Sequence, residues 1–151
     1  MRTIKNIVAQ LIRKYGTVDP FEIAASKHIL VILEPLGFTQ GYFNTYKRIR
    51  MIHINESLSE YRRRFVCAHE LGHAILHPGI NTLFMRSSTL YSVGRIEREA
   101  NEFAAELLLP DEVIQEYESW GLTIREAAVT YGVPIEAAEL KKMPSEFSQK
   151  N

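Results

Sequence analysis

The sequence of 151 residues lacks several features that define whole classes of protein. Its single cysteine, Cys67, cannot form an internal disulfide or build a thiolate zinc site, which fits a reducing compartment. The longest uninterrupted apolar run, Ile29 to Leu33, is far shorter than the roughly 20 residues of a membrane span. Charged residues near the N-terminus also leave no uninterrupted apolar stretch of the length that a signal peptide needs. We therefore expect a soluble, cytoplasmic protein without a membrane partner.

The composition also argues against a charge-driven partner. Lys plus Arg and Asp plus Glu each number 18, so there is no net charge to attract nucleic acid or anionic lipid. Hydrophobic residues make up 46% of the chain, which is typical of a globular protein. At this length, the chain is expected to form one domain with its own core.

Hydrophobic spacing and capping residues predict an α+β fold with its sheet near the front. Apolar residues at helical spacing before Gly16 and the Asp19-Pro20 pair predict two early helices, the second over residues 20–27. Short β-branched or aromatic runs predict three strands, and periodic stretches after them predict further helices. The strands are expected at 29–33, 41–45 and 49–54, and the later helices from Ser57 or Ser59 to 77, then 95–108, 110–117, 123–132 and 134–142. Residues 78–94 are expected to form a long loop.

The most informative stretch is His69-Glu70-x-x-His73, inside the predicted long helix. Residues four apart lie on one face of an α-helix, so both imidazoles can reach a single ion. Zinc favours such nitrogen ligands, and Glu70 is placed to hold and deprotonate a water beside the ion. The alternative is a pair of solvated histidines on an amphipathic helix. Gly72 suggests close packing or substrate access here, because glycine is costly inside a helix.

A catalytic zinc needs a third protein ligand and one open position. The residue ten positions after His69 is Gly79, which excludes the metzincin arrangement. Glu97, on the predicted helix 95–108, is the favoured third ligand, and Glu99 is its rival because the two point in different directions. Asn101 shares a face with Glu97 and is expected to orient a ligand histidine.

Two further residues are candidates for other roles near the motif. His77 lies too far along the helix to face the same ion, so it is expected to be an end-of-helix residue. Tyr91, in the predicted long loop, is a candidate donor to the reaction's oxyanion, although a tyrosine packed on the surface is the commoner case.

The segments HELGHAILH and IEREANEFAAELLLP, about twenty residues apart, resemble the ImmA/IrrE family of zinc metallopeptidases. The resemblance spans roughly Ile52 to Pro110, including a strand that ends in Asn55 and an arginine-rich run into the motif helix. The LLLP end departs slightly from the family's usual LLMP. The resemblance implies a small gluzincin-like domain, for which we expect a three-stranded, antiparallel-type sheet packed on the HExxH helix.

The resemblance also implies a function. Zn²⁺ would be held by His69, His73 and a glutamate of the second helix, with Glu70 as the base. The implied substrate is a helix-turn-helix repressor of a prophage or mobile element, whose cleavage relieves repression of transcription. The short chain favours the ImmA branch of the family.

The implied organisation is a single domain in three parts. Residues 1–110 would form the metallopeptidase core, 111–142 a helical segment packed on or adjacent to it, and 143–151 a frayed tail. Because gluzincin substrates commonly pair with an edge strand beside the motif helix, residues 49–54 are expected to be that edge.

Two other functions remain open from the sequence. The chain could be a metal-binding anti-repressor that acts by binding without hydrolysis. It could also be a DNA-binding regulator, because the predicted helices around Gly132 have a helix-turn-helix outline. The second of these helices carries Glu136 and Glu139 where a DNA-reading helix needs basic and amide side chains. Direct DNA binding is therefore not expected.

Overall fold

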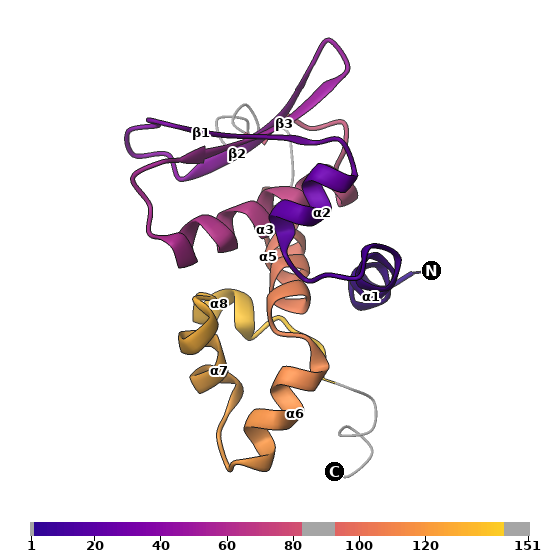
Figure 1. Cartoon of the computed structure of the whole chain (residues 1–151), viewed down its shortest axis with the longest axis vertical. Helices are drawn as coiled ribbons and strands as arrows, with labels where there is room; N and C mark the ends of the chain where they lie inside the picture. Colours follow the sequence, from indigo (N-terminus) through magenta and orange to yellow (C-terminus); the bar gives the residue numbers. More distant parts are fainter. Residues whose placement is uncertain (1, 83–92, 144–151) are drawn as a thin grey trace.

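The computed structural model describes residues 2–82 and 93–143 (Figure 1). Tyr91 and the predicted tail beyond Met143 lie outside the described residues. Within the described ranges the chain forms seven helices and three strands, in this order: α1 (Ile4–Tyr15), α2 (Pro20–Ser26), β1 (Leu30–Glu34), β2 (Gly41–Tyr46), β3 (Ile49–Asn55), α3 (Glu60–Leu76), α5 (Val93–Leu108), α6 (Asp111–Ser119), α7 (Ile124–Tyr131) and α8 (Ile135–Ala138). None of these helices is long and apolar enough to cross a membrane.

The predicted α+β class is confirmed, but the sheet is mixed rather than antiparallel. β2 and β3 form an antiparallel hairpin, with Tyr46 opposite Ile49 across a two-residue turn. Lys47 and Arg48 in that turn both have positive φ, so it forms without the Asn-Gly pair that usually favours such turns. β1 then pairs with β3 in parallel, from Leu30 opposite Met51 to Glu34 opposite Asn55.

The strand order β1-β3-β2 corrects the prediction that residues 49–54 are an edge. Those residues form the central strand, because β1 and β2 occupy both of its hydrogen-bonding sides. Its last four residues, 52–55, are buried. β1, the most apolar run of the sequence, is an edge instead, and its Leu30 and Leu33 are 52% and 46% exposed. Hydrophobicity alone did not reveal which strand lies in the middle.

The predicted helix ends follow from capping residues. Asp19 and Ser59 accept hydrogen bonds from backbone amides in the first turns of α2 and α3. Thr123 forms a reciprocal capping box with Glu126 at the start of α7. Gly16 and Gly132 end α1 and α7 in the left-handed conformation, with φ of 69° and 71°.

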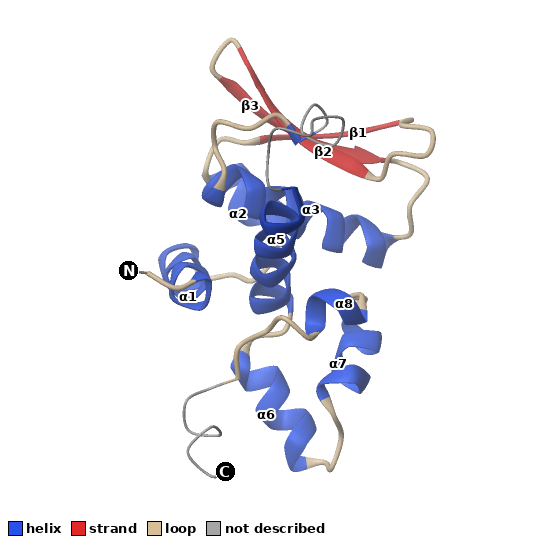
Figure 2. Cartoon of the chain, turned by 180° about the vertical axis from the view of Figure 1, so that it is seen from behind, coloured by secondary structure: helices blue, strands red, loops and turns tan. Residues whose placement is uncertain are grey.

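α3 is the centre of the molecule. The sheet and α2 cover one side of it, and α5 crosses the other side (Figure 2). Every residue of α3 from Phe65 to Ala74 is therefore buried. Gly72 permits the close approach of α5, because a Cβ there would lie 3.1 Å from three side-chain atoms of Phe103. The close packing suggested by Gly72 is thus present, and it fixes α3 and α5 against each other.

The last helix is much shorter than predicted. A helix was expected over residues 134–142, but α8 covers only Ile135–Ala138. Beyond it, Leu140 and Lys141 donate to carbonyls three residues back, which tightens the chain into a turn. α8 packs on α5 at the side away from the sheet (Figure 1). A four-residue helix in this position is too short to act as the reading helix of a helix-turn-helix.

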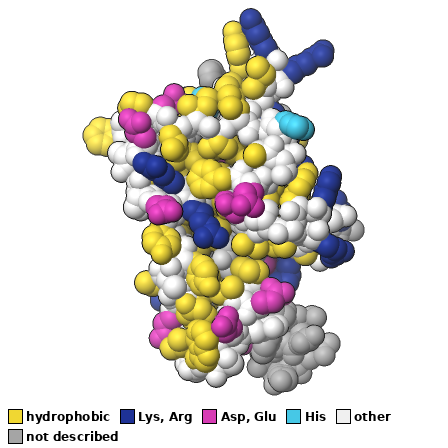
Figure 3. Space-filling view, in the orientation of Figure 1, with side chains coloured by type: hydrophobic (Ala, Val, Ile, Leu, Met, Phe, Trp, Pro, Cys, Tyr) yellow, Lys and Arg dark blue, Asp and Glu magenta, His cyan; other side chains and the backbone are white. Residues whose placement is uncertain are grey.

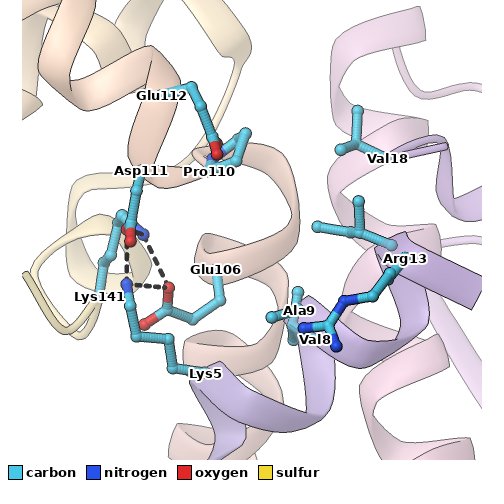
Figure 4. Close-up of a pocket in the computed structure, with 11 residues that line it drawn as sticks. Lys5, Val8, Ala9, Arg13, Val18, Glu106, Pro110, Asp111, Glu112 and Lys141 are labelled. Carbon is cyan, nitrogen blue, oxygen red and sulfur yellow. Dashed lines mark hydrogen bonds and ion pairs between the residues drawn. The ribbon is translucent and has the colours of Figure 1, made fainter. Parts of the chain in front are cut away.

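A buried charge cluster joins α1, α5 and α6 to the segment after α8 (Figure 4). The Lys141 Nζ lies 2.7 Å from Glu106 Oε1 and 2.8 Å from Asp111 Oδ1, and the Lys141 and Glu106 side chains are only 1% and 2% exposed. The Lys5 Nζ lies 2.5 Å from the same Asp111 oxygen. Burial opposes ionisation of Asp111, but hydrogen bonds from Lys141 and Lys5 hold its pKa below the usual range.

This cluster forms one wall of a cavity of about 450 Å³ whose other wall is mostly apolar (Figure 4). Other charges are exposed at the far end of the molecule. Figure 3 shows basic side chains projecting at the tip of the β2–β3 hairpin, where Lys47 and Arg48 are exposed.

Candidate metal centre

α3 and α5 bring three possible metal ligands together. His69 and His73 lie one turn apart on α3, and Glu97 faces both from the second turn of α5. The Glu97 carboxylate lies 3.1 Å from the His69 Nε2 through one oxygen and 2.9 Å from the His73 Nε2 through the other. One ligand atom from each of the three residues can be chosen so that all lie within 4.8 Å of one another. The distances suit a single ion between them.

Burial and neighbouring charges shift the pKa values of His69 and Glu97. His69 is 7% exposed and His73 fully buried, whereas the Glu97 side chain is 29% exposed and opens the group to solvent. Burial acts to lower the pKa of His69, but the nearby Glu97 and Glu70 carboxylates and Asn101 raise it above its ordinary value. Burial likewise opposes ionisation of Glu97, yet hydrogen bonds from both histidines hold its pKa well below the usual range. Glu97 is therefore a carboxylate in the neutral pH range.

Asn101 lies where the helical spacing predicts. Its side-chain oxygen is 2.8 Å from the His69 Nδ1, on the opposite side of the ring from Glu97. When the Nε2 of His69 carries no proton, its Nδ1–H donates to this oxygen. Asn101 thereby fixes the orientation of the His69 ring.

Glu70 is 1% exposed, and its partner Thr82 had no signal in the sequence. The Thr82 hydroxyl lies 3.2 Å from the Glu70 Oε1, and it accepts a 2.6 Å hydrogen bond from the backbone amide of Phe43 in β2. Thr82 thus links the Glu70 carboxylate to the sheet edge. Sequence analysis placed Thr82 only in a long loop, because the contact joins residues 39 positions apart.

A cleft of about 410 Å³ opens beside these residues. One wall is formed by Phe38 to Gly41, which lead into β2, and the opposite walls come from α3 and α5. Asn55, buried at the end of β3, holds that segment by donating to the backbone oxygens of Gly37 and Thr39, at 2.9 and 3.0 Å. The strand-ending asparagine of the sequence motif therefore shapes the cleft.

The rival ligand Glu99 does not join His69 and His73. Its carboxylate lies 3.0 Å from the His77 Nε2, and the His77 Nδ1 lies 3.0 Å from the His73 Nδ1. His77 is the C-cap of α3, as its end-of-helix position predicts. The contact between His77 and Glu99 is a feature that sequence reasoning did not find.

Among the other histidines, His53 lies apart from this group. Its two ring nitrogens bond to Glu34 and Asn44, at 2.6 and 2.9 Å, and its ring stacks on Tyr42 with 4.2 Å between the centroids. Its partners all belong to the sheet, so His53 is a structural histidine of β3.

Two helical histidines, a glutamate from a second helix and a neighbouring carboxylate, placed beside a cleft, form the kind of site that metallopeptidases use. Comparison with known proteins agrees. The chain matches the family model described as the IrrE N-terminal-like domain over residues 24–142. It therefore belongs to the ImmA/IrrE family of metallopeptidases, as its sequence motifs indicate.

Three relatives illustrate the range of the family. The chain is 48% identical over 141 residues to "Uncharacterized immunity region protein 2" of Bacillus phage phi105, covering 93% of this chain and 89% of that protein. It is 32% identical over 142 residues to "Metallopeptidase ImmA" of Bacillus subtilis (strain 168), covering 91% and 83%. Against "Radiation response metalloprotease IrrE" of Deinococcus radiodurans, it is 37% identical over 99 residues, covering 62% of this chain and 29% of that protein.

Proposed function

We propose that this protein is a zinc-dependent, cytoplasmic endopeptidase that cleaves a helix-turn-helix repressor and so relieves repression of transcription. The observation that carries the proposal is the convergence of His69, His73 and Glu97, with Glu70 beside them in a cleft next to the sheet. The similarity to an immunity-region protein of a phage and to ImmA supports a repressor as the substrate class.

The donor set fits zinc. Two imidazole nitrogens and one carboxylate oxygen are a common protein contribution to a catalytic zinc, which leaves one position open. Cys67 is fully buried, and burial raises the pKa of its thiol, so it does not compete as a ligand. We therefore propose His69, His73 and Glu97 as the metal ligands. When bound, zinc would lower the pKa of a water molecule to about 7 and polarise the scissile carbonyl.

The remaining chemistry belongs to Glu70. Its carboxylate would accept the proton of the attacking water, hold it, and deliver it to the nitrogen of the leaving amine. The Thr82 hydroxyl, 3.2 Å from the Glu70 Oε1, would keep the carboxylate oriented during this transfer. Because Glu70 is buried, bulk water would not exchange this proton freely.

The corrected strand order changes where the substrate would pair. β3 is central and has no free side, whereas β2 is an edge strand whose first residue, Gly41, lines the cleft. Thr82 already bonds the backbone of Phe43 on that edge, so the substrate is not expected to pair along the middle of β2. We propose instead that an extended segment of the repressor lies against the wall formed by Phe38 to Gln40, with its scissile bond in the cleft between Phe38 and Glu97. Contacts with this wall would hold the substrate extended across the site.

The proposal is tested by incubating the purified, zinc-loaded protein with a helix-turn-helix repressor of the proposed class. We expect a discrete pair of repressor fragments that a chelator abolishes and added zinc restores. An intact repressor that nevertheless loses its operator DNA in the same mixture would contradict hydrolysis and favour an anti-repressor that acts by binding.

Substitution of the two rival glutamates tests the ligand set. Glu97→Ala removes a carboxylate that lies about 3 Å from both histidines, whereas Glu99→Ala leaves those three residues in place. We expect Glu97→Ala to lose most of its zinc in metal analysis after dialysis and Glu99→Ala to retain it. Loss of zinc in Glu99→Ala alone would overturn the assignment.

Zinc affinity should fall as the pH is lowered. The raised pKa of His69 means that the metal-free protein keeps this proton to higher pH than a free histidine does, and zinc must displace it. The favourable contact between protonated His69 and Glu97 is fully present below the ordinary histidine pKa and is lost as pH rises through the raised value. Apparent affinity should therefore fall about tenfold per pH unit below the raised pKa. Chelator competition across the range from about pH 6 to 8 measures this slope, and a flat profile would contradict it.

A further inference from the structure

A line of side chains runs behind His73, on the side away from Glu97. The His73 Nδ1 lies 3.0 Å from the His77 Nδ1, and the His77 Nε2 lies 3.0 Å from the Glu99 Oε1. His73 is fully buried, the His77 side chain is 10% exposed, and the Glu99 side chain, at 33%, reaches the surface. The line therefore connects a proposed metal ligand to a carboxylate at the protein surface.

The backbone explains how His77 reaches this position. α3 ends at Leu76, and His77 leaves the helix with φ of −132° and ψ of 54° while its amide still donates to the His73 carbonyl. Pro78 follows, and a residue before proline is disfavoured in the helical conformation. His77 is thus held one turn from His73 but is turned out of the helix and toward α5.

The hydrogen bonds can run in only one direction when His73 binds a metal through its Nε2. That nitrogen then carries no proton, so the proton of the neutral ring is on the Nδ1 and is donated to His77. The His77 Nδ1 must accept, which places the proton of His77 on its Nε2. That N–H donates to the Glu99 carboxylate, which is an acceptor at the end of the line.

The Nδ1 of His69 is held by a different kind of partner. Its Nδ1 meets the side-chain oxygen of Asn101 directly, at 2.8 Å, whereas His73 reaches its carboxylate through a second imidazole. Groups that hold the second nitrogen of a metal-binding histidine commonly affect metal affinity by 10- to 100-fold. Both proposed imidazole ligands would thus have a fixed tautomer and a fixed ring orientation.

We propose that His77 and Glu99 form a positioning pair, which sets the tautomer and ring orientation of His73 for the metal without binding the metal. This inference rests on the metal site of the proposed function. It gives a role to the two residues that sequence analysis left as an end-of-helix histidine and a rival ligand. Arg95, whose side chain is 70% exposed, lies 3.9 Å from Glu99 on the solvent side and is not part of the line.

The test measures zinc affinity by competition with a chromogenic chelator in four variants. His77→Ala should weaken zinc binding about 10- to 100-fold. His77→Gln should recover most of that loss, because its amide oxygen can accept from the His73 Nδ1–H. Glu99→Ala should weaken binding by a smaller factor, and Arg95→Ala, which removes an exposed contact to Glu99, should bind as the parent does.

A second measurement reads the tautomers directly. Long-range ¹H–¹⁵N spectra of the zinc-loaded parent should place the proton on the Nδ1 of His73 and on the Nε2 of His77. A merely structural role of His77 would not require this assignment. A proton on the His77 Nδ1 would overturn the proposal, and so would unchanged zinc affinity in His77→Ala.

The outcomes separate this inference from the proposed function. If the parent protein binds no zinc, the metal site itself fails and this inference falls with it. If the parent binds zinc and His77→Ala binds it equally well, only the positioning pair is wrong. The zinc-edge X-ray absorption of the parent should indicate two imidazoles, and a third imidazole would show His77 to be a ligand instead.

Discussion

Glu70→Gln should bind zinc as tightly as the parent protein and cleave the repressor about 10²- to 10⁴-fold more slowly. The amide keeps the size of the buried side chain and one oxygen that can accept from the Thr82 hydroxyl, but it cannot accept the proton of the attacking water. Zinc retention follows because Glu70 is not one of the three residues whose ligand atoms converge. Fragment formation over time on a gel, with zinc content measured on the same sample, gives both values.

Glu60→Gln is the matched control. It makes the same chemical change on the same helix, but Glu60 is exposed in the first turn of α3, far along the helix from the motif. It should cleave at the parent rate. If Glu70→Gln cleaves as fast as Glu60→Gln, Glu70 is not the base. If Glu70→Gln still releases the repressor from DNA without cutting it, binding alone explains the function.

Lys141→Met should destabilise the protein by about 3 kcal/mol or more, since breaking a buried ion pair leaves an uncompensated charge. The Lys141 amine contacts both Glu106 and Asp111, and its side chain is almost fully buried. Lys5, 3.3 Å from Glu106, would compensate only in part. The free energy of unfolding from urea titration, measured at neutral pH, checks this value.

The neighbouring Lys142 provides the control. Its side chain is 68% exposed and lies 3.5 Å from Glu102, so Lys142→Met should change the free energy of unfolding by less than about 1 kcal/mol. We propose that residues 111–142 and the preceding core unfold as one unit, in which case Lys141→Met should keep a single transition. Two separate transitions, or a change as small as that of Lys142→Met, would contradict this view.

Most features that depend on neighbouring residues could be predicted from the sequence. Helix starts at Asp19, Ser59 and Thr123 could be predicted because capping depends on a few neighbouring residues. The pairing of Glu97 with the two histidines could be anticipated from helical spacing and from the resemblance to a known family. In both cases, the relevant residues lie on one element or on two elements with strong periodicity.

The features that sequence reasoning missed depend on contacts between distant segments. The insertion of β3 between β1 and β2 is set by long-range pairing, and the apolar run of β1 suggested burial that an edge strand does not have. Thr82 meets Glu70 only because the chain returns past β2. His77 reaches Glu99 because it leaves the helix and turns toward α5, and no local pattern encodes that approach.

A crystal structure of the zinc-loaded protein, with anomalous data at the zinc edge, tests the central claim most directly. We expect one strong peak about 2.0–2.2 Å from the Nε2 atoms of His69 and His73 and from a carboxylate oxygen of Glu97. The fourth neighbour should be solvent from the cleft. A peak bound by Glu99 or His77, or none between the two α3 histidines, would contradict the account.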